Sequence, residues 1–258
     1  MDLGLAGRSA LVTGASKGIG LASAWSLARE GCNVHLAART AADLEKARAE
    51  IAGRFGVSVE IHATDLSVGD NARALLDACK DVDILVNNAG AIPGGSIEAV
   101  GEPRWREAWD LKVFGYINTC RAALANMKAR GRGVIVNVIG AAGERPSAGY
   151  IAGAGGNAAL MAVTRALGAS STRYGVRVVG INPGLIETDR LITLARTRAQ
   201  AQLGDAERWR ETLDPTFPPG MPAHIGDMVA FLASDLSANT TGTIITIDGG
   251  ASARVGAS

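Results

Sequence analysis

The chain has 258 residues, of which 47% are hydrophobic and 20% are charged, and this composition excludes a disordered, collagen-like or coiled-coil protein. Lys and Arg total 26 against 25 Asp and Glu, so no excess of charge predicts nucleic acid or an acidic membrane as a partner. Glycine is unusually frequent, at 33 residues, about twice its ~7% average usage. We therefore expect one globular domain, residues 1–258, whose backbone approaches other groups closely in several places.

Short β-rich runs alternate with longer helical patterns along the chain. The predicted strands are Ser9–Thr13, Asn33–Ala38, Val57–Ala63, Ile84–Asn87, Val134–Val138, Val176–Ile181 and Thr243–Ile247. The predicted helices are Ile19–Glu30, Asp43–Phe55, Asp70–Cys79, Trp105–Ala129, Asn157–Tyr174 and Ile225–Ser234. Repeated strand–helix–strand units form right-handed crossovers, so the chain is predicted to be an α/β protein with a doubly wound, parallel, seven-stranded sheet covered on both faces.

Residues 188–222 interrupt this alternation. They contain two helix-like pieces, and the stretch 214–222 holds four prolines. An insertion before the last helix and strand is suited to a lid over a site at the carboxyl ends of the strands. An ordinary surface excursion explains the insertion equally well.

Cysteines and histidines are scattered through the sequence. They are Cys32, Cys79, Cys120, His35, His62 and His224. No C-x-x-C or H-E-x-x-H spacing occurs among them, so we predict neither a disulfide framework nor a metal site. The beginning of the chain does not resemble a secretion signal, and the uncharged run 146–164 contains Pro146 and four glycines. We therefore expect a cytoplasmic protein without a membrane partner, in which that run is packed interior.

A glycine-rich stretch follows the first predicted strand. It reads Thr13-Gly14-Ala15-Ser16-Lys17-Gly18-Ile19-Gly20. Glycines at these spacings permit a tight turn and bring backbone N–H groups and the dipole of the next helix against a pyrophosphate. By itself this signal is weak, because any tight strand-to-helix turn favours glycine.

The end of the second predicted strand bears on the choice of dinucleotide. A carboxylate at this point would bind a free ribose 2′-hydroxyl, but the chain has Ala38 and Arg39 there. Arg39 together with Lys17 would pair with a 2′-phosphate, which predicts NADP(H) in preference to NAD(H). Two independently solvated cations are the alternative.

Four further signals come directly after later strands. They are Asp65-Leu66, Asn87-Asn88-Ala89-Gly90, Pro183-Gly184 followed by Thr188, and Asp248-Gly249-Gly250. Each alone could be a strand-terminating turn. Together, the patterns T-G-x-x-x-G-x-G, N-N-A-G and P-G-x-x-x-T resemble the short-chain dehydrogenase/reductase family in order and spacing, from Thr13 to Gly250.

This resemblance implies a Rossmann-type sheet, a nicotinamide cofactor, a small-molecule substrate and a homodimer or homotetramer. It also implies that Asp65 lies near the adenine, Asn87 and Gly90 along the ribose, and Thr188 near the carboxamide. The cofactor-binding residues expected in all are Thr13, Gly14, Ser16, Lys17, Gly18, Ile19, Gly20, Arg39, Asp65, Leu66, Asn87, Ala89, Gly90, Pro183, Gly184 and Thr188.

The sequence departs from the family at the catalytic positions. Family members have an Asn, a Ser and a Tyr-x-x-x-Lys pair, and these four positions are occupied here by Lys112, Gly140, Gly153 and Asn157. Tyr150, however, precedes Asn157 by a spacing similar to the Tyr-x6-Lys of enoyl-acyl-carrier-protein reductases. In addition, Lys112 occupies the family's Asn position and Asn157 its Lys position, so these two residue types are exchanged between two helices.

An exchanged lysine has a chemical use. An ammonium within ~4–6 Å lowers the pKa of a tyrosine by about 1–3 units. We therefore predict Tyr150 as proton donor, Lys112 as the cation that tunes it, and Asn157 as the group that orients ribose or water. Alternatively, Lys112 is a solvated helix lysine and the ring of Tyr150 is simply packed.

Two weaknesses of this assignment are visible in the sequence. Glycines 153, 155 and 156 would each cost about 1 kcal/mol inside a helix, so the helix is expected to begin only near Asn157, which leaves Tyr150 on a loop. Ser147 is the one hydroxyl in that loop available to replace the hydroxyl lost at Gly140.

Two functions follow. The first is an NADP(H)-dependent oxidoreductase that transfers hydride to or from a small carbonyl, alcohol or activated alkene at a non-standard site. The second is a non-catalytic cofactor-binding homologue that acts as a sensor or as an inactive subunit.

Overall fold

The computed structural model describes residues 2–254, apart from the side chains of residues 197, 198 and 201. Its strands are β1 (Ser9–Thr13), β2 (Asn33–Ala38), β3 (Val59–Ala63), β4 (Ile84–Asn87), β5 (Gly133–Val138), β6 (Val176–Pro183) and β7 (Ile244–Ile247). All neighbours pair in parallel, in the order β3-β2-β1-β4-β5-β6-β7. The direction of winding reverses after β1, so the predicted doubly wound seven-stranded sheet is confirmed.

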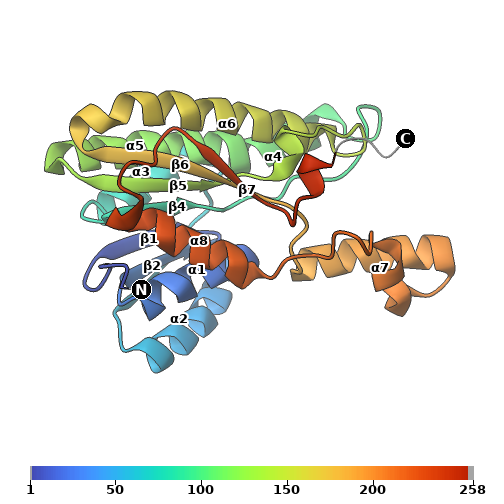
Figure 1. Ribbon diagram of the computed structural model, residues 1–258, viewed down its shortest axis with the longest axis horizontal. Coiled ribbons are helices and arrows are strands. Elements are labelled where there is room, and N and C mark those ends of the chain that lie inside the picture. The colour runs from blue at the N-terminus through green and yellow to red at the C-terminus, as the bar shows by residue number, and fades with distance from the viewer. Residues whose placement is uncertain (1, 255–258) are drawn as a thin grey trace.

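Helices cover both faces of this sheet (Figure 1). They are α1 (Gly18–Arg29), α2 (Ala41–Phe55), α3 (Gly69–Ala78), α4 (Glu102–Trp109), α5 (Gly115–Arg130), α6 (Ile151–Ser171), α7 (Asp189–Leu203) and α8 (Pro222–Ala233). Helices α1, α2 and α8 lie on one face, and α3, α5 and α6 on the other. Strands β4 and β6 are buried along their whole length, as expected of parallel strands sandwiched between helical layers.

Helix α6 begins earlier than the sequence predicts. Its first residue is Ile151, so the expected start near Asn157 is wrong. A Cβ on Gly156 would lie 3.1 Å from Cγ2 of Val113, and Nε1 of Trp109 donates to the carbonyl of Ala152 at 2.9 Å. The glycines let α6 approach the 109–113 segment closely, and this packing outweighs their low helix propensity.

The uncharged run 146–164 lies mostly within α6. Ala152, Leu160 and Met161 are buried there against the rest of the fold. No helix within residues 2–254 combines the length and the apolar composition that crossing a bilayer requires.

The insertion at residues 188–222 forms a helical excursion beside the sheet. Helix α7 and a 3₁₀ segment, Ala206–Thr212, enclose a small apolar cluster around Ala199 and Trp209. Two backbone hydrogen bonds close the base of this excursion. The N–H of Glu187 donates to the carbonyl of Gly220 at 2.8 Å, and the N–H of Gly220 donates to the carbonyl of Leu185 at 2.9 Å. In Figure 1 α7 projects outside the helical layers.

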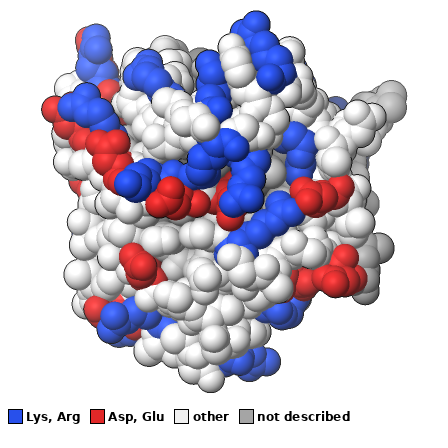
Figure 2. Space-filling model, turned by 90° about the vertical axis from the view of Figure 1, so that its left-hand side faces the viewer, with Lys and Arg blue, Asp and Glu red and all other residues white. Residues whose placement is uncertain are grey.

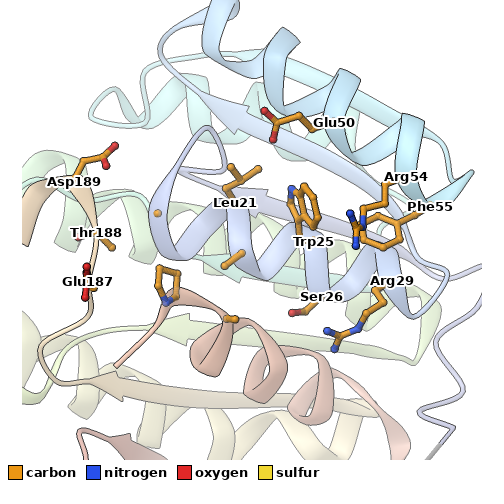
Figure 3. Close-up of a pocket in the computed structure, with 14 residues that line it drawn as sticks. Leu21, Trp25, Ser26, Arg29, Glu50, Arg54, Phe55, Glu187, Thr188 and Asp189 are labelled. Atoms are coloured by element: carbon orange, nitrogen blue, oxygen red, sulfur yellow. The ribbon is translucent and has the colours of Figure 1, made fainter. Parts of the chain in front are cut away.

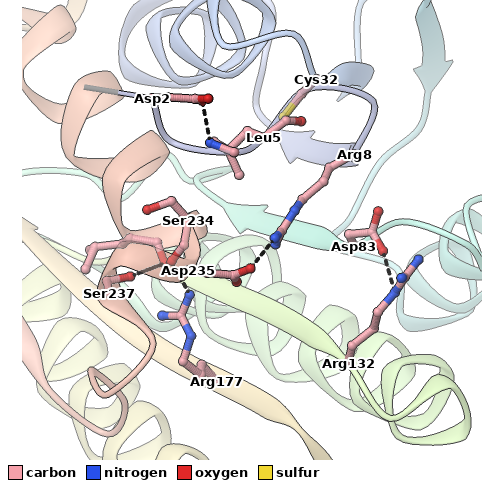
Figure 4. A network of polar contacts seen from close by, with 12 residues as sticks. Asp2, Leu5, Arg8, Cys32, Asp83, Arg132, Arg177, Ser234, Asp235 and Ser237 are labelled. Atoms are coloured by element: carbon pink, nitrogen blue, oxygen red, sulfur yellow. Dashed lines mark hydrogen bonds and ion pairs between the residues drawn. The ribbon is translucent and has the colours of Figure 1, made fainter.

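Polar contacts join the chain at the amino ends of the strands (Figure 4). The guanidinium of Arg177, on β6, donates to the carbonyls of Ser234 at 2.9 Å and Thr240 at 3.3 Å. Arg8 pairs with Asp235 close by. Figure 2 shows the side of the molecule opposite α7, where Lys and Arg gather in a band with carboxylates among them. The charges are mixed, in keeping with the small net charge of the chain.

Candidate active site

The loop after β1 is tied to the loop after β4. The hydroxyl of Thr13 accepts hydrogen bonds from the N–H groups of Asn88 at 2.9 Å and Ala89 at 3.1 Å. The side-chain amide of Asn88 donates in return to the carbonyls of Thr13 and Gly14, at 3.1 and 3.2 Å. These bonds fix the two glycine-rich loops against each other.

Glycine is required in the first of these loops. Gly14 has φ +66°, and a Cβ there would lie 2.9 Å from Cα of Ala89. A Cβ on Gly20 would lie 2.2 Å from the carbonyl oxygen of Gly14. Only glycine permits this approach, which brings the amino end of α1 onto the loop.

The amino end of α1 is suited to an anion. Its N-cap residue, Lys17, makes no side-chain capping bond, and the first turn holds no acidic residue. The first N–H groups of a helix lack partners within the helix and carry partial positive charge. Together with the close glycine contacts, this arrangement fits the pyrophosphate of a dinucleotide.

Open parallel sheets bind ligands at the carboxyl ends of their strands, where the strand order reverses, and this edge of the sheet is called the cleft below. Its adenosine end follows β2 and β3. Arg39 is exposed directly after β2. Asp65 accepts hydrogen bonds from the N–H of Ser67 at 3.0 Å and from its hydroxyl at 2.8 Å. The bond from the Ser67 N–H, helped by the nearby charge of Arg39, holds the pKa of Asp65 below its usual value.

Residues after β6 face the first loop. A Cβ on Gly184 would lie 2.5 Å from Cβ of Asp248, so two of the sequence signals are packed together. Thr188 is the N-cap of α7, and its hydroxyl accepts from the N–H of Leu191 at 3.4 Å. Its methyl group would lie 3.4 Å from a Cβ placed on Gly18, which places Thr188 over the glycine-rich turn.

The side chain of Asn87 has a structural role. It is 1% exposed, and it donates to the side chain of Asn137 at 3.0 Å and accepts from the hydroxyl of Thr119 at 2.7 Å. These bonds direct its amide into the fold, so only its backbone is available to the cleft. The neighbouring Asn88, which is not among the residues expected to bind the cofactor, joins the two loops.

Lys112 and Asn157 meet at the carboxyl end of β5. The ammonium of Lys112 donates to the carbonyl of Ile139 at 2.6 Å, and a Cβ on the next residue, Gly140, would lie 2.8 Å from Nδ2 of Asn157. The Lys112 stem also passes Gly90, where a Cβ would lie 2.8 Å from its Cδ. The exchanged pair therefore does reach a common place beside the N-N-A-G loop.

The ammonium of Lys112 is not a solvated surface charge. Burial, assisted by the charge of Arg190, lowers its pKa to about 8. Asn157 is 3% exposed, and within residues 2–254 its Oδ1 atom has no hydrogen-bond partner. A buried acceptor without a partner is costly, so this atom is a candidate for binding a hydroxyl or a water molecule.

Lys112 lies in a π-helical segment, Asp110–Phe114, between α4 and α5. Such bulges shift the side chains that follow them and are frequent at functional sites. Sequence reasoning predicted one continuous helix here and missed the bulge. It also missed Arg190, whose guanidinium donates to the carbonyl of Ile92.

Tyr150 is the N-cap residue of α6 and not part of a loop remote from it. A Cβ on Gly153 would lie 2.1 Å from Cε1 and Cζ of Tyr150, so the ring covers the position where the family has its tyrosine. The ring also packs against an apolar cluster that contains Ile92 and Ala108. Its place is therefore held by packing on several sides.

Ser147, the hydroxyl considered as a replacement at Gly140, is exposed and its Oγ accepts from the N–H of Gly149 at 3.3 Å. Asn182 lies beside Gly140 instead. Its Oδ1 accepts from the N–H of Gly140 at 3.3 Å, and its Nδ2 donates to the carboxylate of Glu144 at 3.0 Å. Asn182 directly precedes the Pro183-Gly184 signal, which is the feature of the sequence that could have indicated it.

A cavity of about 510 Å³ adjoins the cleft (Figure 3). Its wall is formed by Leu21 and Trp25 of α1 and by Phe55 of α2, and it reaches the cleft at Gly18 and Thr188. It contains neither Tyr150 nor Lys112. The cavity is thus a neighbour of the cofactor loop and not the place of the predicted chemistry.

Three metal-ligating side chains that no sequence motif joins lie close together. The sequence predicts no metal site from His35, His62 and Cys79, yet in the structure their side-chain ligand atoms all lie within 4.8 Å of one another. Three separate elements bring them together, so no short sequence pattern could have shown the cluster.

Comparison with known proteins identifies the family. The model of the short chain dehydrogenase family matches residues 8–199, and the chain belongs to this family of oxidoreductases. It is 34% identical to the 2-keto-3-deoxy-L-fuconate dehydrogenase of Xanthomonas campestris pv. campestris over 251 residues, which cover 95% of this chain and 80% of the relative. It is 36% identical to the granaticin polyketide synthase putative ketoacyl reductase 2 of Streptomyces violaceoruber over 255 residues, covering 94% and 95%.

Among solved structures, the fold is similar to that of L-sorbose reductase from Gluconobacter frateurii complexed with NADPH and L-sorbose. The TM-score is 0.92 at 29% sequence identity, and the match covers 99% of this chain and 100% of the other. The similarity extends over the insertion as well as over the sheet.

Proposed function

We propose that this protein is an NADP(H)-dependent oxidoreductase that transfers hydride to or from a small carbonyl compound, alcohol or activated alkene. The observation that carries the proposal is the enclosed ammonium of Lys112, held beside Gly140 and Asn157 in a cleft whose glycine contacts fit a dinucleotide. The names of the Xanthomonas relative and of the Gluconobacter reductase refer to keto sugars and L-sorbose, which favours a carbonyl substrate.

The cofactor is held by the chain in two places. The backbone of the Gly14–Gly20 turn and the amino end of α1 bind the pyrophosphate. Lys17, exposed in this turn, and Arg39, exposed directly after β2, would pair with a 2′-phosphate. The bound cofactor supplies or accepts the hydride, and the remaining chemistry belongs to side chains at the end of β5 and the start of α6.

Tyr150 is proposed to donate the proton to the substrate oxygen. Lys112 keeps this region positive while it is protonated, which favours loss of the phenolic proton. The partnerless Oδ1 of Asn157 accepts from a ribose hydroxyl or from water and so holds that group in place. The excursion at 188–222, anchored at its base, is proposed to cover the substrate as a lid.

The test is NADPH oxidation with a panel of ketones, keto sugars and enones. Removing a general acid typically costs about 10²- to 10⁴-fold in rate, so we expect a loss of this size for Tyr150→Phe. Lys112→Met should also slow turnover, because it removes the charge that favours loss of the phenolic proton. Tyr174→Phe and Lys46→Met are matched controls, because both residues lie outside the cleft, and they should retain full turnover. Unchanged turnover in both cleft variants would remove these residues from the mechanism.

A second function is favoured by one specific observation. Gly140 supplies no hydroxyl to a substrate oxygen, and neither Ser147 nor Asn182 restores one at that position. A site without this hydroxyl is what we expect of a cofactor-binding homologue without turnover, which would act as a sensor or an inactive subunit. Tight NADPH binding without turnover, together with a heteromer in pull-down experiments, supports it, and turnover of any substrate eliminates it.

A further inference from the structure

A cluster of metal-ligating side chains lies on the β3 side of the sheet. His35 is in β2, His62 is in β3, and Cys79 directly follows α3. In the parallel register His35 is opposite Glu60 and Ala37 is opposite His62, so the side chains of residues 35, 60 and 62 point to the same face. None of these residues has a part in the proposed oxidoreductase site.

The distances within the cluster are those of a coordination polyhedron. Nδ1 of His35 lies 3.2 Å from Nε2 of His62, and Sγ of Cys79 lies 3.6 and 3.4 Å from these two nitrogens. In tetrahedral coordination with Zn–N of about 2.0–2.1 Å and Zn–S of about 2.3 Å, ligand atoms stand about 3.3–3.6 Å apart. The three atoms therefore already occupy three corners of such a tetrahedron.

Hydrogen bonding alone leaves this cluster poorly satisfied. Nδ1 of His35 also lies 3.5 Å from Oε2 of Glu60, so one ring nitrogen faces three polar atoms. A neutral ring nitrogen has either one proton or one lone pair and makes one such bond. A cation placed among the ligand atoms of His35, His62 and Cys79, which all lie within 4.8 Å of one another, would satisfy these three atoms at once. The exposed carboxylate of Glu60 would complete the site by turning toward the ion.

We propose that His35, His62 and Cys79 bind one Zn²⁺ ion per chain, with Glu60 as the fourth ligand. Thiolate and imidazole ligands select Zn²⁺ over Mg²⁺ or Ca²⁺, and four protein ligands make a closed, structural site. The ion would join β2, the edge strand β3 and the end of α3. Cys79 is 3% exposed, whereas the Glu60 side chain is 62% exposed, so the ion enters past the carboxylate.

The test uses the full-length protein, freed of metal with a chelator and kept reduced without thiols. Titration with Co²⁺ should give the visible bands of a tetrahedral ion and a thiolate-to-cobalt charge-transfer band, saturating at one ion per chain, and Zn²⁺ should displace them. Zn²⁺ should also raise the midpoint of thermal unfolding, because a ligand that binds only the folded state stabilises it. Absence of a tetrahedral spectrum at tenfold excess of Co²⁺ would overturn the proposal.

Variants assign the ligands. Cys79→Ser and His62→Gln should lose the charge-transfer band or weaken binding at least about tenfold, whereas Cys32→Ala and His224→Gln remove the same residue types elsewhere and should bind normally. Equal binding in all four variants contradicts the site. If Cys79→Ser does not fold, X-ray absorption of the Zn²⁺-loaded wild type decides, because a first shell without sulfur contradicts the proposal and one sulfur with nitrogen and oxygen ligands supports it.

Discussion

In the proposed function, the choice of dinucleotide depends on Arg39. It is exposed after β2, and no carboxylate at that strand end competes for a ribose hydroxyl. We expect Arg39→Ala to weaken NADPH binding by about 2 kcal/mol, because hydrogen bonds between charged groups contribute about 1.5–3 kcal/mol, and to leave NADH binding nearly unchanged. Fluorescence titration with both dinucleotides measures this. Equal weakening of both would contradict the assignment to the 2′-phosphate.

The half-buried Lys112 links the proposed chemistry to pH. Its pKa is lowered to about 8 from 10.5, so between these values the unfolded chain holds a proton that the folded chain has released. Stability rises with pH wherever the unfolded state binds more protons. The free energy of unfolding of the wild type should therefore rise relative to that of Lys112→Met between pH 8 and 10.5, by on the order of 2–3 kcal/mol.

Urea unfolding of both proteins at several pH values provides the measurement. Lys46→Met, which alters an exposed lysine of α2, is the control and should stay parallel to the wild type. Turnover of the wild type should fall as pH rises through about 8, since Lys112 then loses its charge. Parallel stability curves for Lys112→Met and wild type would show that the ammonium is not buried.

At the scale of elements, α6 shows how packing decides where a helix begins. Gly155 is exposed, and a Cβ there would make an ordinary contact of 3.5 Å with Trp109. Gly155→Ala should therefore stabilise the protein by about 0.5–1 kcal/mol, the gain in helix propensity. Gly153→Ala must displace the ring of Tyr150, which would be 2.1 Å away, and should destabilise by about 1–3 kcal/mol.

Thermal and urea unfolding of these two alanine variants compare the same substitution within one turn of α6. Gly153→Ala should also lose turnover if Tyr150 is the proton donor, whereas Gly155→Ala should keep it. Retained turnover in Gly153→Ala would separate the position of the Tyr150 ring from the reaction.

At the scale of the whole molecule, Arg177 connects segments distant in the sequence. It is 9% exposed, and its guanidinium spans the carbonyls of Ser234 and Thr240. Arg177→Ala leaves these acceptors without their partner and should lower the free energy of unfolding by about 2–4 kcal/mol. Arg8→Ala removes an exposed pair with Asp235 and should cost less than about 1 kcal/mol. Urea denaturation of both variants checks this ranking, and equal losses would contradict it.

Much of the architecture follows from local patterns in the chain. The bounds of β1, β2 and β4 agree with the predicted strands. In β1 and β4 the reason is burial, because strands covered on both faces read as largely apolar runs. The glycine turn, the N-N-A-G stretch and the Pro183-Gly184 signal each follow a strand, and a parallel sheet necessarily places such ends at one edge. The family and the sheet were for this reason predictable from sequence.

Only the tertiary structure decided the contacts between elements. The start of α6 depends on Trp109 and Val113, the pKa of Lys112 depends on its burial, and the cluster of His35, His62 and Cys79 depends on the register of β2 with β3. Local propensity measures the conformation that a segment favours in isolation, whereas these features arise from the free energy of bringing distant segments together. No pattern within one segment encodes that quantity.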